Sequence, residues 1–428
     1  MSSLKFRLKR LFERIWVPIG AYGLLGVIAA AMGSMLADVI PSSLAFQIGA
    51  ESIDAILNIM ASSMLAVTTF SLSIMLSAFN TASSTATPRA FLLLKTDQTA
   101  QQVLASFIGA FIFSLVGIIS LQIGLYGEGG RVILFGATLL VLSLIIINLV
   151  RWIGHLTDFG RLGDTLARVE RAAGDAMAAR LAAPFLGGRP LVGTVPDDAV
   201  PMRATDIGHV RFIDLHRLDK LAETHAATIY LAVLPGGFAT RDMPLAHIAG
   251  GPVGPDYDGL LQDALSCFEI SADRSFDQDP RFGLIVMSEI ASRALSPAVN
   301  DPGTGIDVIR RMTRILSQWD APADPEVTLS HLFVRGLKAE DVLVDAFQAI
   351  ARDGAALIEV QIAVQRSLLA LTRLQPPVFG PAAVAQSQRA LAHAADAMLI
   401  GTDIDRLRQM SEEIAAAARP AQGQIGQM

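Results

Sequence analysis

Charged residues are scarce in this sequence of 428 residues, and the scarcity is concentrated in its first third. Only 17% of the residues are Asp, Glu, Lys or Arg, whereas 52% are hydrophobic. Ordinary soluble domains carry about 25% charged residues. Residues 1–150 hold 14 of the charged residues and residues 151–428 hold 60. This distribution excludes a wholly soluble protein and predicts a membrane part followed by a water-soluble part.

Several chemical signatures are also missing. Cys267 is the single cysteine, so the chain has neither an internal disulfide nor a pair of cysteines for a metal site. The seven histidines lack the HxxxH and HExxH spacings of zinc sites. No GxSxG, Walker or kinase motif occurs, and no basic tract suggests nucleic acid. We therefore expect no enzyme activity, no cofactor, no metal and no nucleic-acid partner.

Four windows of the membrane part lack charge. They contain 23, 34, 30 and 19 residues and cover Ile15–Ala37, Ala55–Pro88, Gln98–Gly127 and Val132–Val150. A bilayer core about 30 Å thick requires about 20 helical residues. Each window is therefore long enough for one span, and none holds two spans with a turn. We predict a four-helix transmembrane domain over residues 1–150.

The Lys and Arg residues that flank these windows predict the orientation. Eleven lie in the N-terminal arm, between the second and third windows, and after the fourth window. Only Arg131 lies in the opposite loops. Because Lys and Arg concentrate on the cytoplasmic side, both termini are expected in the cytoplasm. The 29 Arg against 5 Lys suggest a GC-rich bacterial genome, and hence the bacterial inner (plasma) membrane.

The second window carries a row of polar side chains. Successive members are three, four or seven residues apart, which places them along one face of a helix. We call this row the polar stripe: Asn58, Ser62, Thr69, Ser73, Ser77, Asn80 and Ser84. Such side chains help packed spans to hydrogen-bond. Around the axis of a homo-oligomer, they would instead line a watery path for a small ion or solute. The interior of each window lacks ionisable groups, which disfavours an ion-coupled transporter.

The soluble part is predicted to be α+β. Residues 151–202 are interpreted as a juxtamembrane helix that extends the fourth span to Ala183, followed by a linker. Residues 203–252 are expected to form a small β-rich module with one inserted helix. Residues 253–418 show helical periodicity and are expected to form a helical cytoplasmic domain. The polar segment 419–428 is expected to be a disordered tail.

The densest polar cluster of the soluble part lies between two predicted helices. Arg293, Ser296, Asn300 and Asp301 are suited to an ion or an anionic head group, with the arginine as counter-charge. A helix–loop–helix corner explains the same residue types, because Asp301 before a proline is a typical helix cap. Both interpretations stay open, and we favour the corner.

Two other features are interpreted as structural. The charged loop 273–281 lacks the spacing and the closing Glu of an EF-hand and is expected to be solvated. The turn Pro235-Gly236-Gly237 lacks the Lys-Ser/Thr ending of a phosphate loop and is expected to be a plain turn.

Three stretches carry a resemblance to a known family. They are Val67-Thr-Thr-Phe-Ser-Leu-Ser-Ile with Ser84 and Thr87-Pro88-Arg89 after it, Phe107-Ile-Gly-Ala-Phe-Ile-Phe-Ser114, and Asp279-Pro280-Arg-Phe-Gly283 followed by Ala294-Leu-Ser-Pro-Ala-Val-Asn-Asp-Pro302. Over residues 10–410 the chain resembles the predicted bacterial membrane proteins of domain-of-unknown-function family twenty-two fifty-four. The resemblance implies four N-terminal spans and a cytoplasmic domain, and it implies no known activity.

Two functions are expected from these observations. The first is a homo-oligomeric channel or pore in the lipid bilayer, lined by the second span. The alternative is a membrane-anchored cytoplasmic sensor or scaffold without transport activity, because the soluble part is large and carries no catalytic signature.

Overall fold

The computed structural model describes residues 17, 19–21, 24–25, 27–28, 50–95, 97–124, 128–157, 159–252, 254–320 and 325–419. The chain divides into two compact units. The N-terminal unit lies within Ser3–Thr165, and the C-terminal unit comprises Leu166–Met428. Each unit has its own buried core.

Long apolar helices build the N-terminal unit: α4 (Ala50–Thr85), α6 (Gln98–Gln122) and α7 (Glu128–Leu156), with the short α5 (Phe91–Lys95) between α4 and α6. Ser52–Thr85, Gln98–Gln122 and Gly130–Leu156 are long and apolar enough to cross a membrane. They correspond to the second, third and fourth predicted windows. The first window, Ile15–Ala37, lies largely outside the described residues, so a fourth span stays a prediction.

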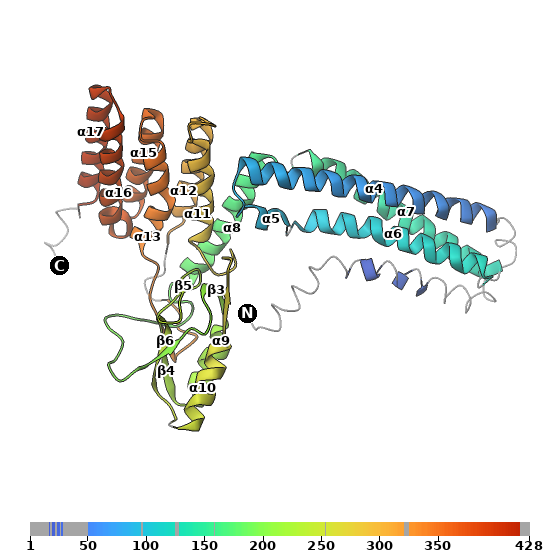
Figure 1. The fold of residues 1–428 in the computed structure, drawn as a ribbon, viewed down its shortest axis with the longest axis horizontal. Helices are drawn as coiled ribbons and strands as arrows, with labels where there is room; N and C mark the ends of the chain where they lie inside the picture. The colour runs from blue at the N-terminus through green and yellow to red at the C-terminus, as the bar shows by residue number, and fades with distance from the viewer. Residues whose placement is uncertain are drawn as a thin grey trace, which may run out of the picture. The chain divides into compact units, whose positions relative to one another are not determined.

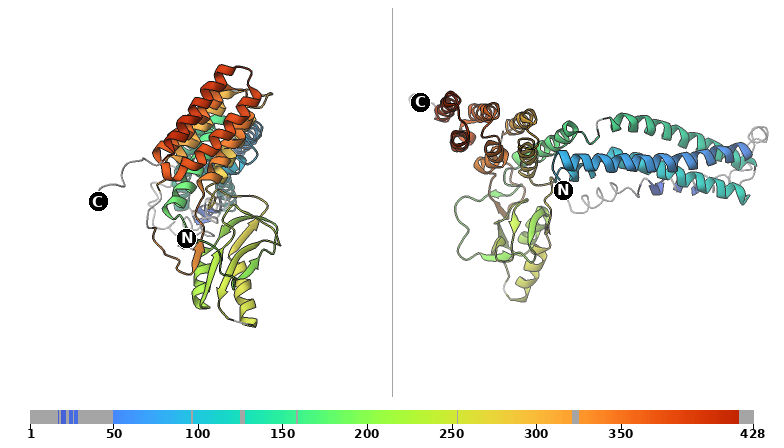
Figure 2. Two further views of the ribbon diagram at one scale, coloured as in Figure 1. Left: turned by 90° about the vertical axis from the view of Figure 1, so that its left-hand side faces the viewer. Right: turned by 45° about the horizontal axis from the view of Figure 1, so that its top comes forward.

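The three long helices run side by side (Figures 1 and 2). Their shared core includes Leu57 of α4, Phe107 of α6 and Leu134 of α7, all fully buried. Gly117 permits the close approach of α6, since a Cβ there would lie 2.9 Å from Leu57 Cδ1. The indole Nε1 of Trp152 donates a buried hydrogen bond of 2.9 Å to Ser71 Oγ. Apolar packing and this one polar link hold α7 and α4 together.

The predicted continuation of the fourth span to Ala183 is wrong. Helix α7 ends at Leu156, and a separate helix, α8, covers Leu162–Ala182. The break contains Gly160, whose φ of +80° is rarely adopted by residues with a side chain. A Cβ at Gly160 would lie 2.7 Å from Ala78 Cβ of α4. The close packing on α4 and the left-handed conformation together account for the glycine and for the interruption of the helix.

Two sheets lie in the C-terminal unit. The first has the order β1-β8-β4-β6-β2, and the second the order β5-β3-β7. Their strands are β1 (Arg189–Pro190), β2 (Val200–Arg203), β3 (Gly208–Ile213), β4 (Ala227–Leu231), β5 (Phe238–Ala239), β6 (Pro244–Gly250), β7 (Phe268–Ser271) and β8 (Leu332–Val334).

Strand β4 is the centre of the larger sheet. Ile229 pairs with Ile248 of the antiparallel β6 and with Leu332 of the parallel β8, and all three side chains are buried. Helices α9 (Leu215–Thr224) and α10 (Pro255–Leu265) lie beside the strands (Figure 1). The sheets thus draw on strands on both sides of the predicted module 203–252, because strand pairing joins segments that are distant in sequence.

The remaining helices pack in layers beside the strands (Figure 2). They are α11 (Phe282–Ala294), α12 (Pro302–Leu316), α13 (Ala339–Leu343), α14 (Ala349–Asp353), α15 (Ile358–Leu374), α16 (Pro376–Ala397) and α17 (Gly401–Ala417). A π-helical turn, η2 (Val344–Gln348), separates α13 from α14. The helical segment from α13 to α14 therefore contains a wider turn, a feature that is frequent near functional sites.

Candidate functional site

The polar stripe lies on the outer face of α4. All seven of its side chains are exposed in the part of the chain that the structure describes. The opposite face of α4 presents Ile53, Leu57 and Met64 to the core shared with α6 and α7. The stripe therefore lies outside the core that the described spans share, on the same outer face as apolar side chains such as Phe70, which is 65% exposed.

The hydroxyl groups of the stripe are bonded to their own helix. Ser62, Thr69 and Ser73 each donate a hydrogen bond of 2.9 Å to the carbonyl oxygen four residues earlier. The amide of Asn58 donates in the same way to the Asp54 carbonyl oxygen at 2.9 Å. Each hydroxyl oxygen keeps its acceptor capacity on the outer side. These bonded members of the stripe thus satisfy their donors within the helix and present their oxygens outward as acceptors.

The polar cluster at 293–301 forms the corner between α11 and α12. Asp301 Oδ1 accepts the backbone N–H of Thr304 at 3.0 Å, and Oδ2 accepts the Thr304 hydroxyl at 2.6 Å. The hydrogen bond from the Thr304 side chain lowers the pKa of Asp301. Ser296 donates its hydroxyl to the Arg293 carbonyl at 2.7 Å. These bonds place Ser296 at the end of α11 and Asp301 at the start of α12, so helix capping explains why both residues occur here.

The four residues of this cluster do not converge on one cavity. Arg293 and Ser296 line a hollow of about 490 Å³ together with Glu289, Ser292 and Asp353. Asn300 and Asp301 are not among its lining residues. Asn300 instead occupies the left-handed backbone region, with φ +50°, which asparagine tolerates better than most residues. The arrangement fits the corner better than a single binding site.

A second charged cluster is more buried than the sequence suggests. The side chain of Asp279 is only 2% exposed, and Arg274 Nη2 lies 2.6 Å from its Oδ2 atom. Asp279 Oδ1 also accepts the backbone N–H groups of Arg281 and Phe282, at 3.1 and 3.2 Å. It therefore satisfies two backbone N–H groups at the start of α11, which begins at Phe282. Burial raises the pKa of Asp279 against the opposing influence of Arg274. The prediction of a solvated loop is wrong for this pair.

The glycine turn packs directly on the same carboxylate. Gly236 has φ +89°, and a Cβ at this position would collide with the carboxylate oxygens of Asp279. The backbone N–H groups of Gly236 and Gly237 donate to Val210 and Leu234 carbonyl oxygens, at 2.8 and 2.9 Å. These amides are therefore not directed at a ligand, and the turn is a plain turn, as predicted. Its glycine is required because Asp279 lies against it.

Arg281 connects this cluster to the π-helical turn. Its Nη2 donates to Asp345 Oδ1 at 3.1 Å, and its Nη1 donates to Asp341 Oδ2 at 3.3 Å. Asp345 belongs to η2, and Asp341 belongs to α13. The ion pairs bring the end of the loop 273–281 against a segment 60 residues later, which no local pattern of the sequence indicates.

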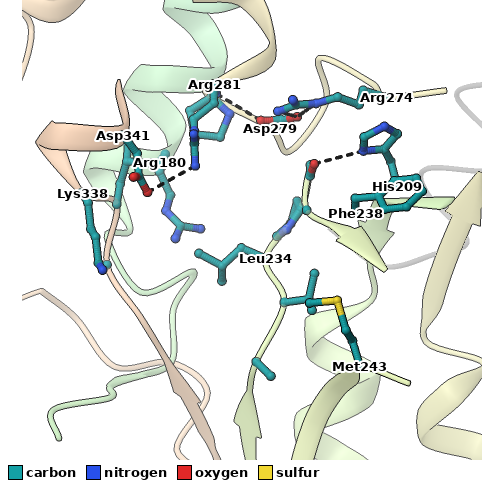
Figure 3. Close-up of a pocket in the computed structure, with 18 residues that line it drawn as sticks. Arg180, His209, Leu234, Phe238, Met243, Arg274, Asp279, Arg281, Lys338 and Asp341 are labelled. Atoms are coloured by element: carbon teal, nitrogen blue, oxygen red, sulfur yellow. Dashed lines mark hydrogen bonds and ion pairs between the residues drawn. The ribbon is translucent and has the colours of Figure 1, made fainter. Parts of the chain in front are cut away.

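A cavity of about 500 Å³ lies between these elements (Figure 3). One side is polar and includes Arg180, Lys338 and Asp341. The other side is apolar and includes Leu234 and Met243. The wall also contains the glycine turn and the Arg274–Asp279 pair, so the two features interpreted as structural from the sequence meet at one place. We call this space the Arg180 cavity.

Arg180 of α8 is the most unusual residue of the Arg180 cavity. It is 4% exposed, and its Nη2 donates to the Arg335 carbonyl oxygen at 3.2 Å. Its Nε atom is buried and has no hydrogen-bond partner among the described residues. Burial lowers the pKa of Arg180 to about 10, so the side chain remains charged at neutral pH. The sequence does not indicate its role, because an arginine on an amphipathic helix usually lies on the solvated face.

Residues 13–370 match the family described as "Predicted membrane protein (DUF2254)". The chain belongs to this family. Its membership confirms the resemblance identified from the sequence, and the apolar helices fit a protein that crosses the membrane several times. Two stretches that carried the resemblance contribute to the clusters described above. Residues 279–283 contain the buried Asp279, and residues 295–302 form the corner before α12.

Curated relatives of this family member are uncharacterized. The proteins Mb1321c of Mycobacterium bovis and Rv1290c of Mycobacterium tuberculosis are each 35% identical to it over 136 residues, which is 31% of this chain and 26% of theirs. MT1328 of Mycobacterium tuberculosis is 37% identical over 139 residues, with the same coverage. The chain thus matches about a quarter of the length of these relatives. No solved structure matches it.

Proposed function

We propose that this family member is an inner-membrane protein that self-associates around α4 and conducts a small ion or solute along the polar stripe. The observation that carries the proposal is the outward position of all seven stripe residues on a helix that is long and apolar enough to span a bilayer. Further copies of the chain and the lipid bilayer are its proposed partners, and no catalytic role is included.

The physical argument rests on what surrounds the outer face of α4. Lipid tails offer no hydrogen bonds to the exposed amide of Asn80 or to the outward oxygens of Thr69 and Ser73. Polar side chains within spans therefore prefer another helix or water. A second copy of α4 can pack against the stripe directly. Several copies arranged around an axis would instead enclose water along the seven stripe residues. The adjacent apolar residues, such as Phe70, then contact neighbouring copies or lipid.

The proposed orientation places both termini in the cytoplasm. The eleven-to-one distribution of Lys and Arg between the two sets of loops supports this arrangement. The C-terminal unit with its Arg180 cavity is then cytoplasmic.

A membrane-anchored sensor without transport is the second candidate, and the Arg180 cavity favours it. A spanning anchor needs no conduction path, whereas a cavity with a buried charge suits recognition of a small molecule. Recording from planar bilayers that contain the purified protein separates the two. Unitary currents are expected for the pore, and silence under both voltage and membrane tension favours the sensor.

Cysteine scanning tests the pore directly. The thiols of Thr69→Cys and Ser73→Cys are expected to react with a small charged thiol reagent from the aqueous side, because the thiolate that reacts forms where water is present. Phe70→Cys is the matched control, since it lies at the same depth on the apolar part of the exposed face. Met64→Cys, which faces the core, is the buried control. Both controls are expected to be protected.

The background for this scan is a Cys267→Ala variant. Burial raises the pKa of the Cys267 thiol to about 11, so the native cysteine itself reacts poorly. Protection of Thr69→Cys and Ser73→Cys in a folded oligomer would contradict the pore and favour helix packing. Protection in a protein that is monomeric would also contradict the pore, because a stripe that faces lipid lacks water as much as a packed stripe does.

A further inference from the structure

We propose that the Arg180 cavity binds a phosphorylated small molecule that has an aromatic or apolar body, of about the size of a mononucleotide. The inference concerns the C-terminal unit alone and holds whether or not the protein conducts ions. It rests on three properties of the cavity: a buried and incompletely bonded arginine, an excess of positive charge, and an apolar wall opposite the charges.

The buried guanidinium is the first property. Arg180 is 4% exposed, yet a single carbonyl oxygen at 3.2 Å is its hydrogen-bond partner in the described part of the chain. Figure 3 shows the guanidinium directed into the cavity, toward the space between Lys338 and Leu234. Buried charges are normally paired or fully hydrogen-bonded. An anion in the cavity would supply the missing acceptors, and a guanidinium binds phosphate oxygens through two parallel hydrogen bonds.

The charge balance of the lining is the second property. Arg274 forms an ion pair with Asp279, and Arg281 forms ion pairs with Asp341 and Asp345. Arg180 and Lys338 have no carboxylate within ion-pair distance among the residues that the structure describes. Asp279 acts on Arg180 beyond ion-pair distance, so Arg180 and Lys338 are the two cations of the lining that are placed to meet a ligand. A phosphate monoester carries a charge of about −1.5 to −2 at neutral pH. This charge balances two cations better than the single negative charge of a carboxylate ligand does.

The apolar wall is the third property. Leu234 and Met243 line the side opposite Arg180, and Phe238 is 51% exposed at the cavity. The Phe238 ring packs against His209 edge to face, with 5.0 Å between the ring centroids. An exposed and held aromatic ring is a suitable surface for a second ring to stack on. The volume of about 500 Å³ lies in the range of sites for small organic ligands, about 300 to 1,000 Å³.

Binding of simple probes to the purified full-length protein tests this inference. AMP, adenosine and inorganic phosphate are titrated separately by calorimetry. AMP is expected to bind, adenosine at least tenfold more weakly because it lacks the phosphate, and inorganic phosphate more weakly than AMP because it lacks the ring. Higher ionic strength is expected to weaken AMP binding, since the recognition is electrostatic.

Two variants assign the binding to this cavity. Lys338→Met is expected to weaken AMP binding at least tenfold, and its side chain is exposed, so folding is not at risk. Lys220→Met is the matched control, because Lys220 is an equally exposed lysine on α9 outside the cavity, and it is expected to bind AMP like the parent. Arg180→Met is expected to abolish binding while the protein stays folded, because it removes a buried charge that makes no ion pair with the described residues.

Each outcome decides the inference. Absence of AMP and phosphate binding by the parent protein would overturn it, and so would equal binding of AMP and adenosine. Equal AMP affinity of the parent and Lys338→Met would place any binding elsewhere and overturn it as well. Silent bilayers do not affect these titrations, so failure of the pore and failure of the ligand site are distinguishable.

Discussion

The two units of the chain satisfy their polar groups in different ways. In α4 of the N-terminal unit, Ser62, Thr69 and Ser73 donate to carbonyl oxygens four residues away in the same helix. In the C-terminal unit, Arg281 reaches Asp345, 64 residues later, and Arg311 reaches Glu170, 141 residues earlier. The first arrangement survives without tertiary structure, whereas the second exists only in the folded unit. Removal of a polar group is therefore expected to lower the free energy of unfolding strongly in the C-terminal unit and only slightly on the polar stripe.

The largest effect is expected from Arg274→Met. The substitution leaves the carboxylate of Asp279 buried without its arginine, and removal of one partner from a buried pair costs about 3 to 5 kcal/mol. Arg217→Met is the matched control, because Arg217 and its partner Asp263 are both about half exposed. An exposed pair contributes about 0 to 1 kcal/mol. Denaturant unfolding of the purified protein measures both losses, and equal losses would contradict a special role for the buried pair.

The pH dependence sharpens this first comparison. Burial raises the pKa of Asp279, and loss of Arg274 removes an influence that lowers it. An acid with a raised pKa in the folded state stabilises the fold below its unfolded pKa, and this contribution is lost as the pH rises through the folded pKa. The cost of Arg274→Met is therefore expected to be larger at neutral pH than below the ordinary carboxyl pKa of about 4. A cost that does not change with pH would show that Arg274 does not lower the pKa of Asp279 in the folded parent.

A smaller loss is expected from Gly236→Ala. The new methyl group would enter the position of the Asp279 carboxylate, and the backbone would hold a residue with a side chain at φ +89°. Overpacking and backbone strain together are expected to cost about 2 to 3 kcal/mol in unfolding free energy. Gly193→Ala is the control, because Gly193 has φ +86° but no atom within 4 Å of the added Cβ. Its loss measures strain alone, and an equal loss at both sites would show that Asp279 does not restrict the turn.

The smallest effect is expected from Ser73→Ala on the polar stripe. Among the described residues, its hydroxyl bonds only to the Thr69 carbonyl oxygen in the same helix, so its removal leaves no buried partner there unsatisfied. The unfolding free energy is expected to change by less than about 0.5 kcal/mol. Ser71→Ala is the comparison, because Ser71 accepts the buried Trp152 hydrogen bond and its loss is expected to cost about 1 kcal/mol. A loss above 1 kcal/mol at Ser73 would indicate that packed contacts, and not water, surround the stripe.

Most helices were predictable from the sequence. The windows for α4, α6 and α7 follow from uninterrupted apolar composition, and the start of α12 follows from Asp301 before Pro302. The break before α8 was not predictable, because the amphipathic pattern continues through Gly160 and only the contact with Ala78 explains the turn. The Arg180 cavity was also missed, because its lining comes from α8, the turn at 235–237, the loop before α11 and the segment before α13.

Composition and periodicity alone determine the features that depend on a single segment. They include the apolar spans, the polar stripe along one face of α4 and the helix cap at Asp301. The local reason is that a helix places residues three and four apart on the same face, whatever surrounds it. Only the tertiary structure decided which arginines are buried, which glycine lies against Asp279 and that the stripe faces outward. These properties depend on which distant segments meet, and hydrophobic packing of the whole unit selects those contacts.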